Sequence, residues 1–208
     1  MNGDSMMSTR GRGFSLIELM ITVLVVAILA AIALPSFRDF MHRNTVTAQA
    51  NQLVASLQYA RNEAVSRRYP TGMCGSTDGA TCPSAGDADF EDGWLVWRSA
   101  SPAAATTTAT YTPSNKDELL RVTQAQNNVS LRAFAGTRTG VFVFDQTGAV
   151  VGANGAVSNI VVCAKNEPED SLGANTARAP GKYVRIDASG RITVQNLAAG
   201  AACNASPD

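Results

Sequence analysis

The chain has 208 residues, and its 17 basic and 17 acidic side chains give a formal net charge of +0. That balance argues against a globally basic nucleic-acid-binding protein and against a highly charged disordered chain. A single histidine, His42, argues against catalysis or metal binding that needs several histidines. The length fits one ordinary domain with an appendage.

The first element along the chain is an apolar run over residues 16–34, in which Glu18 is the only charged residue and Thr22 the only polar one. A helix rises about 1.5 Å per residue, so this run is long enough to cross a hydrocarbon layer about 30 Å thick. Arg10 and Arg12 precede it. Because positive charge stays cytoplasmic, the body that follows the run is expected outside the inner membrane.

Two interpretations of this N-terminus compete. A secretory signal peptide has a basic start, an apolar stretch and small residues at its cleavage site, which the Ala-Ile-Ala string at 31–33 imitates. An acidic residue inside an apolar segment raises the free energy of membrane insertion by about 2.5–3.5 kcal/mol, so Glu18 is expected to have a function or a charged partner. That requirement favours a helix that is retained and cut before its apolar part.

The string Gly-Phe-Ser-Leu-Ile-Glu at residues 13–18 resembles the prepilin signature of type IV pilins and type II secretion pseudopilins. The resemblance implies that a prepilin peptidase cuts after Gly13, that the new N-terminus at Phe14 is methylated, and that Glu18 neutralises the terminal amine of a neighbouring subunit. An amine and a carboxylate are tolerated in an apolar bundle only as a pair. Glu18 is therefore expected to set the register between neighbouring helices during assembly. The alternative is that its side chain snorkels toward the lipid headgroups.

An amphipathic pattern follows Pro35. Apolar residues step by four and three along one helix face, at Val46, Ala50, Leu53, Leu57, Ala60 and Ala64. One helix is therefore predicted from about residue 15 to about residue 67, with a break or softening near Pro35, and it is ended by the Tyr-Pro-Thr-Gly string at 69–72. We expect this apolar stripe to pack against a head domain of the same chain rather than to form an interface with a partner protein.

Short β-branched stretches separated by turn residues replace the helix signal after Met73. Strands are predicted at residues 93–98, 119–123, 129–134, 141–144, 149–151, 159–164, 182–186 and 191–195, with a hairpin turn at 187–190. Such a series predicts an antiparallel sandwich or paired sheets. Trp94 and Trp97 are expected on opposite faces of their strand. The uncharged segment 99–113 is predicted to be a loop.

The order of helix then strands, Cys74 soon after the helix, the Gly-Trp-Leu-Val string at 93–96 and Gly190-Arg191 resemble the FimT/GspH branch of the pilin superfamily. This branch comprises minor pilins of type IV pili and minor pseudopilins of type II secretion. The resemblance implies an α+β, pilin-like lollipop, with a long N-terminal transmembrane and amphipathic helix packed on an antiparallel β-rich, two-sheet head. The expected boundaries are a prepilin leader at 1–13, a transmembrane half-helix at 14–35, an amphipathic half-helix at 36–68 and a periplasmic head at 69–208.

Four cysteines occur, at Cys74, Cys82, Cys163 and Cys203, and none forms the C-x-x-C pattern of a zinc ribbon or a thioredoxin. Outside the cytoplasm an even count indicates disulfides. Of the three possible pairings, Cys74–Cys82 with Cys163–Cys203 is favoured, because the first closes a short turn-rich loop and the second ties a C-terminal tail to a strand. Loop entropy predicts contributions of about 2.6 and about 4 kcal/mol. Reduced, buried cysteines are the alternative.

A basic region precedes the C-terminus. Residues 171–195 hold Arg178, Lys182, Arg185 and Arg191 against Asp187 alone, a local net charge of +3 (4 − 1). Basic side chains clustered on a hairpin can contact phosphates, and Gly190 is expected to let DNA approach the backbone at an exposed tip. In FimT-type pilins a Gly-Arg-x-Arg motif is associated with DNA capture, but residues 190–193 read Gly-Arg-Ile-Thr and lack the second arginine. DNA contact is therefore a secondary expectation, and a solvated basic face is the alternative.

No nucleophile, zinc-protease or phosphate-loop motif occurs, and the acidic string at 167–170 is interpreted as a solvated loop rather than a calcium site. The sequence predicts a minor pilin or pseudopilin, a non-catalytic assembly subunit without cofactor, metal or small-molecule substrate. Its expected partners are the inner membrane, other pilins or pseudopilins and prepilin peptidase, with DNA as a secondary partner.

The expected location is a single pass through the inner membrane, with the N-terminus cytoplasmic before cleavage and the head periplasmic, at the tip or shaft of a pilus or pseudopilus. The sequence leaves open which of the two filaments it serves. The alternative function is a secreted β-rich periplasmic binding protein with an ordinary cleaved signal peptide. N-terminal sequencing distinguishes the two, since methylated Phe14 supports a pilin and a start at Leu34 supports the alternative.

Overall fold

A single helix begins the part of the chain that the computed structural model describes, namely residues 14–82, 90–103, 110–124, 126–135, 140–151, 158–198 and 200–204. This helix, α1 (Leu16–Arg67), contributes to two compact units, one ending at Arg38 and one running from Asp39 to Asp208. A break or softening was predicted near Pro35, but Pro35 lies inside α1 and the helix is not broken there. The helix stops at Arg67, as predicted.

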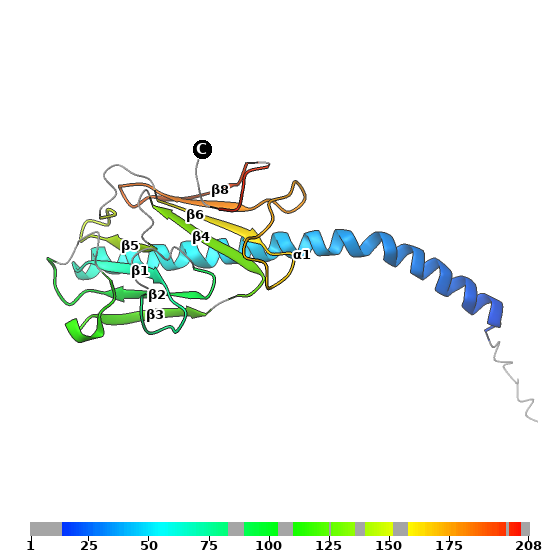
Figure 1. Ribbon diagram of the computed structural model, residues 1–208, viewed down its shortest axis with the longest axis horizontal. Coiled ribbons are helices and arrows are strands. Elements are labelled where there is room, and N and C mark those ends of the chain that lie inside the picture. Colours follow the sequence, from blue (N-terminus) through cyan, green and yellow to red (C-terminus); the bar gives the residue numbers. More distant parts are fainter. Residues whose placement is uncertain are drawn as a thin grey trace, which may run out of the picture. The chain divides into compact units, whose positions relative to one another are not determined.

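Within those ranges, eight strands and a short 3₁₀ helix follow: β1 (Thr71–Gly75), β2 (Gly93–Arg98), η1 (Pro113–Asn115), β3 (Glu118–Gln124), β4 (Val129–Ala135), β5 (Val141–Phe144), β6 (Ser158–Ala164), β7 (Lys182–Ile186) and β8 (Ile192–Asn196). They form two four-stranded sheets with orders β3-β2-β1-β5 and β4-β6-β7-β8 (Figure 1). Every neighbouring pair is antiparallel. The expected α+β fold, a long N-terminal helix packed against two antiparallel sheets, is confirmed.

Two segments differ from the sequence prediction. Thr71–Gly75 forms β1, an inner strand of the first sheet, although no strand was predicted there because its two glycines lower strand propensity. Residues 149–151, which were predicted to form a strand, contribute only an isolated bridge between Val150 and Phe144. The backbone here bonds to two different neighbours, because the Val150 N–H donates to the Ala188 carbonyl at 3.1 Å and the Val151 N–H donates to the Val143 carbonyl of β5 at 2.8 Å.

The main core lies between the second half of α1 and the inner faces of both sheets. All six residues of the predicted apolar stripe are buried there, from Val46 to Ala64. Trp94 joins this core, whereas Trp97 belongs to a second cluster on the outer face of the first sheet. The expectation that the two tryptophans occupy opposite faces is therefore confirmed.

Two disulfides secure loops against the outer faces of the sheets. Cys74 on β1 is bonded to Cys82, and Cys163 on β6 is bonded to Cys203 near the C-terminus. These are the two pairs that the loop argument selects. Their sequence separations of 8 and 40 residues mean that the second bond closes the larger loop, and it therefore removes more entropy from the unfolded chain.

Candidate functional site

The N-terminal end of α1 carries the residues of the prepilin-like signature. Gly13, the predicted cleavage position, lies outside the described residues, and Phe14 and Ser15 precede the helix. The Ser15 carbonyl accepts the Leu19 N–H at 3.1 Å. Glu18 stands in the first turn, where the partial positive charge of a helix N-terminus favours a carboxylate. The helix thus begins two residues after the predicted new N-terminus.

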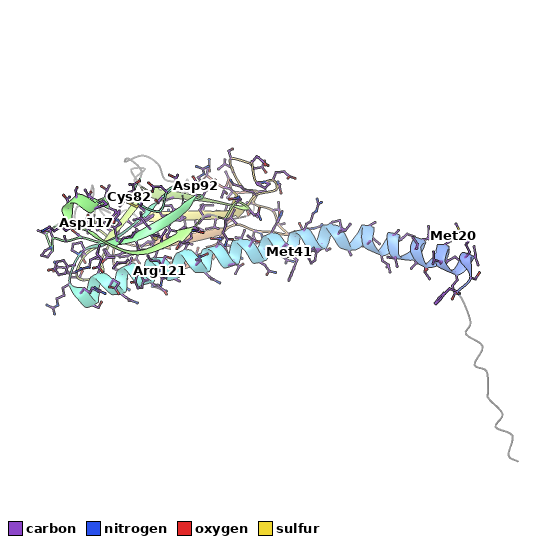
Figure 2. All side chains as sticks on the ribbon, turned by 90° about the horizontal axis from the view of Figure 1, so that it is seen from below. Met20, Met41, Cys82, Asp92, Asp117 and Arg121 are labelled. Atoms are coloured by element: carbon purple, nitrogen blue, oxygen red, sulfur yellow. A yellow bond between two sulfur atoms is a disulfide. The ribbon has the colours of Figure 1, made fainter. Side chains whose placement is uncertain are left out.

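The side chains at residues 14–38 are all exposed, and most of those up to residue 34 are apolar. Phe14 is 80% exposed, and Met20 lies on the same stretch (Figure 2). The Thr22 hydroxyl donates to the Leu19 carbonyl at 2.9 Å, so this polar group needs no water. By length and composition the stretch can cross a membrane, with a mean hydropathy of 2.8 over 18 residues. Such a surface requires lipid or neighbouring apolar helices around it.

The structure does not bring the four basic residues of the C-terminal region onto one face. Lys182 and Arg185 are three residues apart on β7 and therefore point to opposite faces of the sheet. Arg185 is paired with Thr193 of β8, on the outer face of the sheet. Arg191 lies one residue before β8, and the Asp187 N–H donates to its carbonyl at 3.1 Å just beyond the last ladder pair, Ile186 with Ile192. Alternation along the strand therefore places Arg191 on the outer face as well.

The other two basic side chains have partners of their own. The Lys182 ammonium donates to the Asn196 side-chain oxygen at 2.7 Å. Arg178 lies 3.6 Å from the carboxylate of Asp39 on α1. Only Arg185 and Arg191 therefore remain as a pair on one face, and DNA contact by the four residues together stays a prediction.

Gly190 has a packing role rather than the open position expected for it. It is buried with φ +76°, and a Cβ built on it would lie 1.9 Å from the Gly148 carbonyl oxygen. Arg61 of α1 completes this junction, because its Nε donates to the Gly148 carbonyl at 3.0 Å and its Nη2 to the Ser189 carbonyl at 3.3 Å. The expectation that Gly190 opens the backbone to DNA is wrong, because the neighbouring turn occupies that space.

A carboxylate closes each of the two turns at this junction. Partial burial acts to raise the pKa of Asp145, but hydrogen bonds from the Thr147 hydroxyl at 2.6 Å, the Thr147 N–H at 2.8 Å and the Ala149 N–H at 3.0 Å leave that pKa lowered. The pKa of Asp187 is lowered by the Ser189 hydroxyl at 2.6 Å and the Arg191 N–H at 2.9 Å. Both carboxylates are therefore held in the charged form.

The sequence predicted the turn at 187–190, but it did not predict that this turn meets the 145–148 turn and Arg61. The signal that was available is the pair of Asp-x-x-Gly strings at 145–148 and 187–190. Each predicts a turn with a glycine at positive φ, and neither predicts its neighbour. Within the described ranges, no three His, Cys, Asp or Glu side chains form a group that could hold a metal ion.

In the described part of the chain, one N-terminal α-helix is apolar at one end and contributes to the core of a two-sheet β head at the other, and this arrangement is pilin-like. A family model described as type II transport protein GspH matches residues 49–190, and one described as prokaryotic N-terminal methylation motif matches residues 9–34. Since the first covers more than half of the chain, the chain belongs to the GspH family. In class it is a pilin-like protein with an N-terminal methylation motif.

Curated relatives match a shorter part of the chain. A fimbrial protein of Pseudomonas aeruginosa is 44% identical over 54 residues, which are 26% of this chain and 34% of that protein. A type IV major alpha-pilin of Moraxella bovis is 46% identical over 44 residues, 21% of this chain and 28% of that one. A fimbrial protein of Neisseria meningitidis is 40% identical over 78 residues, 35% and 46% of the two chains. The chain thus spans less than half of the length of these relatives.

A solved structure shares the fold. The type IV minor pilin FimU of Pseudomonas aeruginosa, crystallised in space group P21, aligns with a TM-score of 0.50 at 17% sequence identity. The alignment covers 76% of this chain and 96% of that chain. At this identity the likeness concerns the fold alone.

Proposed function

We propose that the chain is an assembly subunit of a type IV pilus or a type II secretion pseudopilus and has no catalytic activity of its own. The observation that carries the proposal is one helix with two surfaces, exposed and apolar over residues 16–34 and buried along a stripe from Val46 to Ala64. A helix that needs apolar surroundings at one end and its own head at the other suits a subunit that passes from a membrane into a helical bundle.

Processing precedes assembly in this proposal. A prepilin peptidase removes residues 1–13 on the cytoplasmic side, and Phe14 becomes the methylated N-terminus. The mature chain spans the inner membrane once over residues 14–35, and its head lies in the periplasm. The match of the N-terminal methylation motif to residues 9–34 supports this sequence of events.

Glu18 supplies the specificity of assembly. Its carboxylate lies in the apolar stretch of α1, where an unpaired charge is expensive. The new terminal amine at Phe14 of a neighbouring subunit is also costly to bury unpaired. The amine and the carboxylate form an ion pair only when the two helices are in register. A subunit that enters out of register leaves both charges unpaired.

Replacement of Gly13 by valine tests the processing step. A peptidase pocket that accepts no side chain excludes a branched one, so Gly13→Val should accumulate in the membrane as a precursor heavier by the 13-residue leader. Gly11→Val, two residues upstream in the same leader, is the matched control and should be processed normally. Mass spectrometry of the N-terminus reads both variants, and a wild-type chain that begins at Leu34 instead of methylated Phe14 would identify an ordinary secretory signal and overturn the proposal.

The proposal names two filaments because the comparisons point to both. The family is described as type II transport, whereas the curated relatives are fimbrial proteins and pilins. Deletion of the chain separates them, since a pilus subunit is needed for surface filaments and a pseudopilus subunit for the release of secreted proteins. Filament counts and the secreted protein fraction of one deletion strain therefore decide which filament it serves.

A further inference from the structure

The two sheets have four outer strands, and three of them are covered or interrupted. On β5 the Val143 carbonyl accepts the Val151 N–H at 2.8 Å, and on β4 the Leu131 carbonyl accepts the Phe90 N–H at 3.1 Å. β3 carries a register shift opposite Val96 and Trp97, where one extra residue forms a bulge. Charged residues flank that bulge at Glu118 and Arg121. Arg121, which Figure 2 labels, has its guanidinium 4.4 Å from the centre of the Tyr59 ring of α1. Bulges and charges protect sheet edges from further pairing.

The fourth outer strand, β8, directs a row of backbone groups away from its sheet. The Leu197 N–H donates to the Gly181 carbonyl at 2.8 Å, and the Asp187 N–H donates to the Arg191 carbonyl. Hydrogen-bonded pairs alternate along an antiparallel ladder, so the bonded pairs between these ends are Arg185 with Thr193 and Tyr183 with Gln195. The backbone N–H and C=O groups at Ile192, Val194 and Asn196 therefore point outward, and no described residue outside the sheet bonds to them.

No protective device occurs on β8. Its sequence, Ile-Thr-Val-Gln-Asn, contains no charge, proline or glycine, and its ladder with β7 has no register shift. Three of its five residues are β-branched, which suits an extended strand. Val194 at its centre is 41% exposed, beside the edge that the backbone leaves open. Figure 1 shows β8 at the margin of its sheet.

The two faces of this edge differ in character. Ile192 packs against the main core, and Val194 lies on the same inner side of the strand. On the outer side, Arg185 and Arg191 lie near Thr193, with Asp187 as the acidic residue beside them. Arg185 forms no ion pair within the part of the chain that the structure describes. A strand added at this edge would therefore meet an apolar inner side and a positively charged outer side.

We propose that the open edge of β8 is a strand-addition site that binds an extended segment from the head of a different filament subunit. The segment presents apolar side chains beside Val194 and an acidic side chain toward Arg185 and Arg191. Backbone pairing supplies affinity and the alternating side chains supply specificity, as in other cases of β-augmentation. The partner rests on the proposed function, because the filament is what brings a second head beside this one.

A proline at Val194 tests the site, because it removes one outward N–H and no bond to β7. Proline is tolerated in edge strands when the missing N–H faces outward. In the native bacterium, full-length Val194→Pro should reach the membrane and be processed like the wild type, yet its share in sheared filaments should fall by about tenfold. Val194→Thr keeps the N–H and is the matched control, which should assemble normally.

Hydrogen exchange supplies an independent measurement. In the purified full-length chain the amides of Ile192, Val194 and Asn196 should exchange rapidly, and in isolated filaments they should be protected. Equal exchange in the two states, or wild-type incorporation of Val194→Pro, would overturn strand addition. Dimerisation of the purified chain that Val194→Pro abolishes would instead make a second copy the occupant and overturn the choice of a different subunit. A wild-type chain that never enters filaments would overturn the proposed function itself, and this partner with it.

Discussion

Gly190 and Gly200 share a left-handed backbone conformation, with φ +76° and +81°, but their surroundings differ. A Cβ on Gly190 would meet the Gly148 carbonyl oxygen at 1.9 Å and the Arg61 Nε at 2.9 Å, whereas nothing lies within 4 Å of a Cβ on Gly200. The two positions therefore separate the cost of backbone strain from the cost of close contact. Gly190 is required by both, since it lets the β7–β8 turn pack on the neighbouring one.

We expect Gly190→Ala to destabilise the soluble head, residues 39–208, far more than Gly200→Ala does. Strain at positive φ alone costs about 1 kcal/mol at either site. At Gly190 the backbone of the Gly148 turn must also move, so the total should reach about 3 kcal/mol or prevent folding. Urea unfolding of the two variants measures the difference, and equal midpoints would show that the turns do not pack as described.

Asp145 makes the stability of the head depend on pH. Its lowered pKa means that the folded state binds a proton less readily than the unfolded state does, so its contribution is present above about pH 4 and is lost as pH falls through the folded pKa. Asp145→Asn should cost about 1 kcal/mol at neutral pH, since the turn is partly exposed. The thermal midpoints of the two proteins should converge as pH falls below about 4 and through the lowered folded pKa of Asp145. A constant difference across this range would contradict the charge-based account.

Local chemistry made several individual residues predictable. The buried stripe of α1 follows from its spacing, and the turn at 187–190 follows from its Asp-x-x-Gly string. The contacts of Arg61 with Gly148 and Ser189 join residues 87 and 128 positions apart. A local sequence pattern cannot report a contact between residues so far apart, so the sequence predicted the 187–190 turn but not the junction.

Among the elements, strands bounded by turns were predicted most closely. β2, β5 and β7 have the predicted bounds because apolar or β-branched runs end at turn residues on each side. β1 was missed because Gly72 and Gly75 lower strand propensity. The glycine at position 72 is explained by tertiary packing, since a Cβ on Gly72 would lie 2.6 Å from the Trp97 ring. Gly72 therefore weakens the local strand signal but leaves the space that the Trp97 ring occupies.

The β7–β8 hairpin sets a limit on DNA binding by the head. Two arginines on one face neutralise at most two phosphates, so any affinity for duplex DNA should show a slope no steeper than about −1.8 in log K against log salt. Arg185→Gln should reduce that slope by about 0.9, because one phosphate contact is lost. Lys182→Gln is the matched control and should leave it unchanged, because Lys182 lies on the other face and is bonded to Asn196.

Fluorescence anisotropy of a labelled duplex over a series of salt concentrations measures these slopes. A slope near −3.6, or one that Lys182→Gln reduces, would mean that all four basic side chains reach DNA together. The hairpin would then have to rearrange, because β7 presents Lys182 and Arg185 on opposite faces.

The chain as a whole combines a long exposed apolar helix surface with a folded head that has a buried core of its own. An exposed apolar helix and a head with its own closed core lie in separate compact units of one chain. The apolar run, the stripe and the strand periodicity made this organisation predictable from the sequence. The edge left open at β8 was not predictable, because the neighbours of a strand are set by the order of strands in the sheet and not by its own residues.

Replacement of Glu18 by alanine separates insertion from assembly at the scale of the whole filament. Removal of an intramembrane charge saves about 2.5–3.5 kcal/mol on insertion scales, so Glu18→Ala should enter the membrane at least as well as the wild type. Its processed form should nevertheless enter filaments poorly, because the amine of the neighbouring subunit would be buried without a partner. The ratio of the chain in sheared filaments to the chain in membranes measures the effect.

Thr22→Val is the matched control for that experiment, because it removes a polar side chain one turn further along the same exposed stretch. The Thr22 hydroxyl is already satisfied by the Leu19 carbonyl of its own helix, so it offers nothing to a neighbour. Thr22→Val should therefore assemble like the wild type. If both variants assemble normally, Glu18 has no role in register. If both fail, apolar packing along the helix decides assembly, and the charge pair does not.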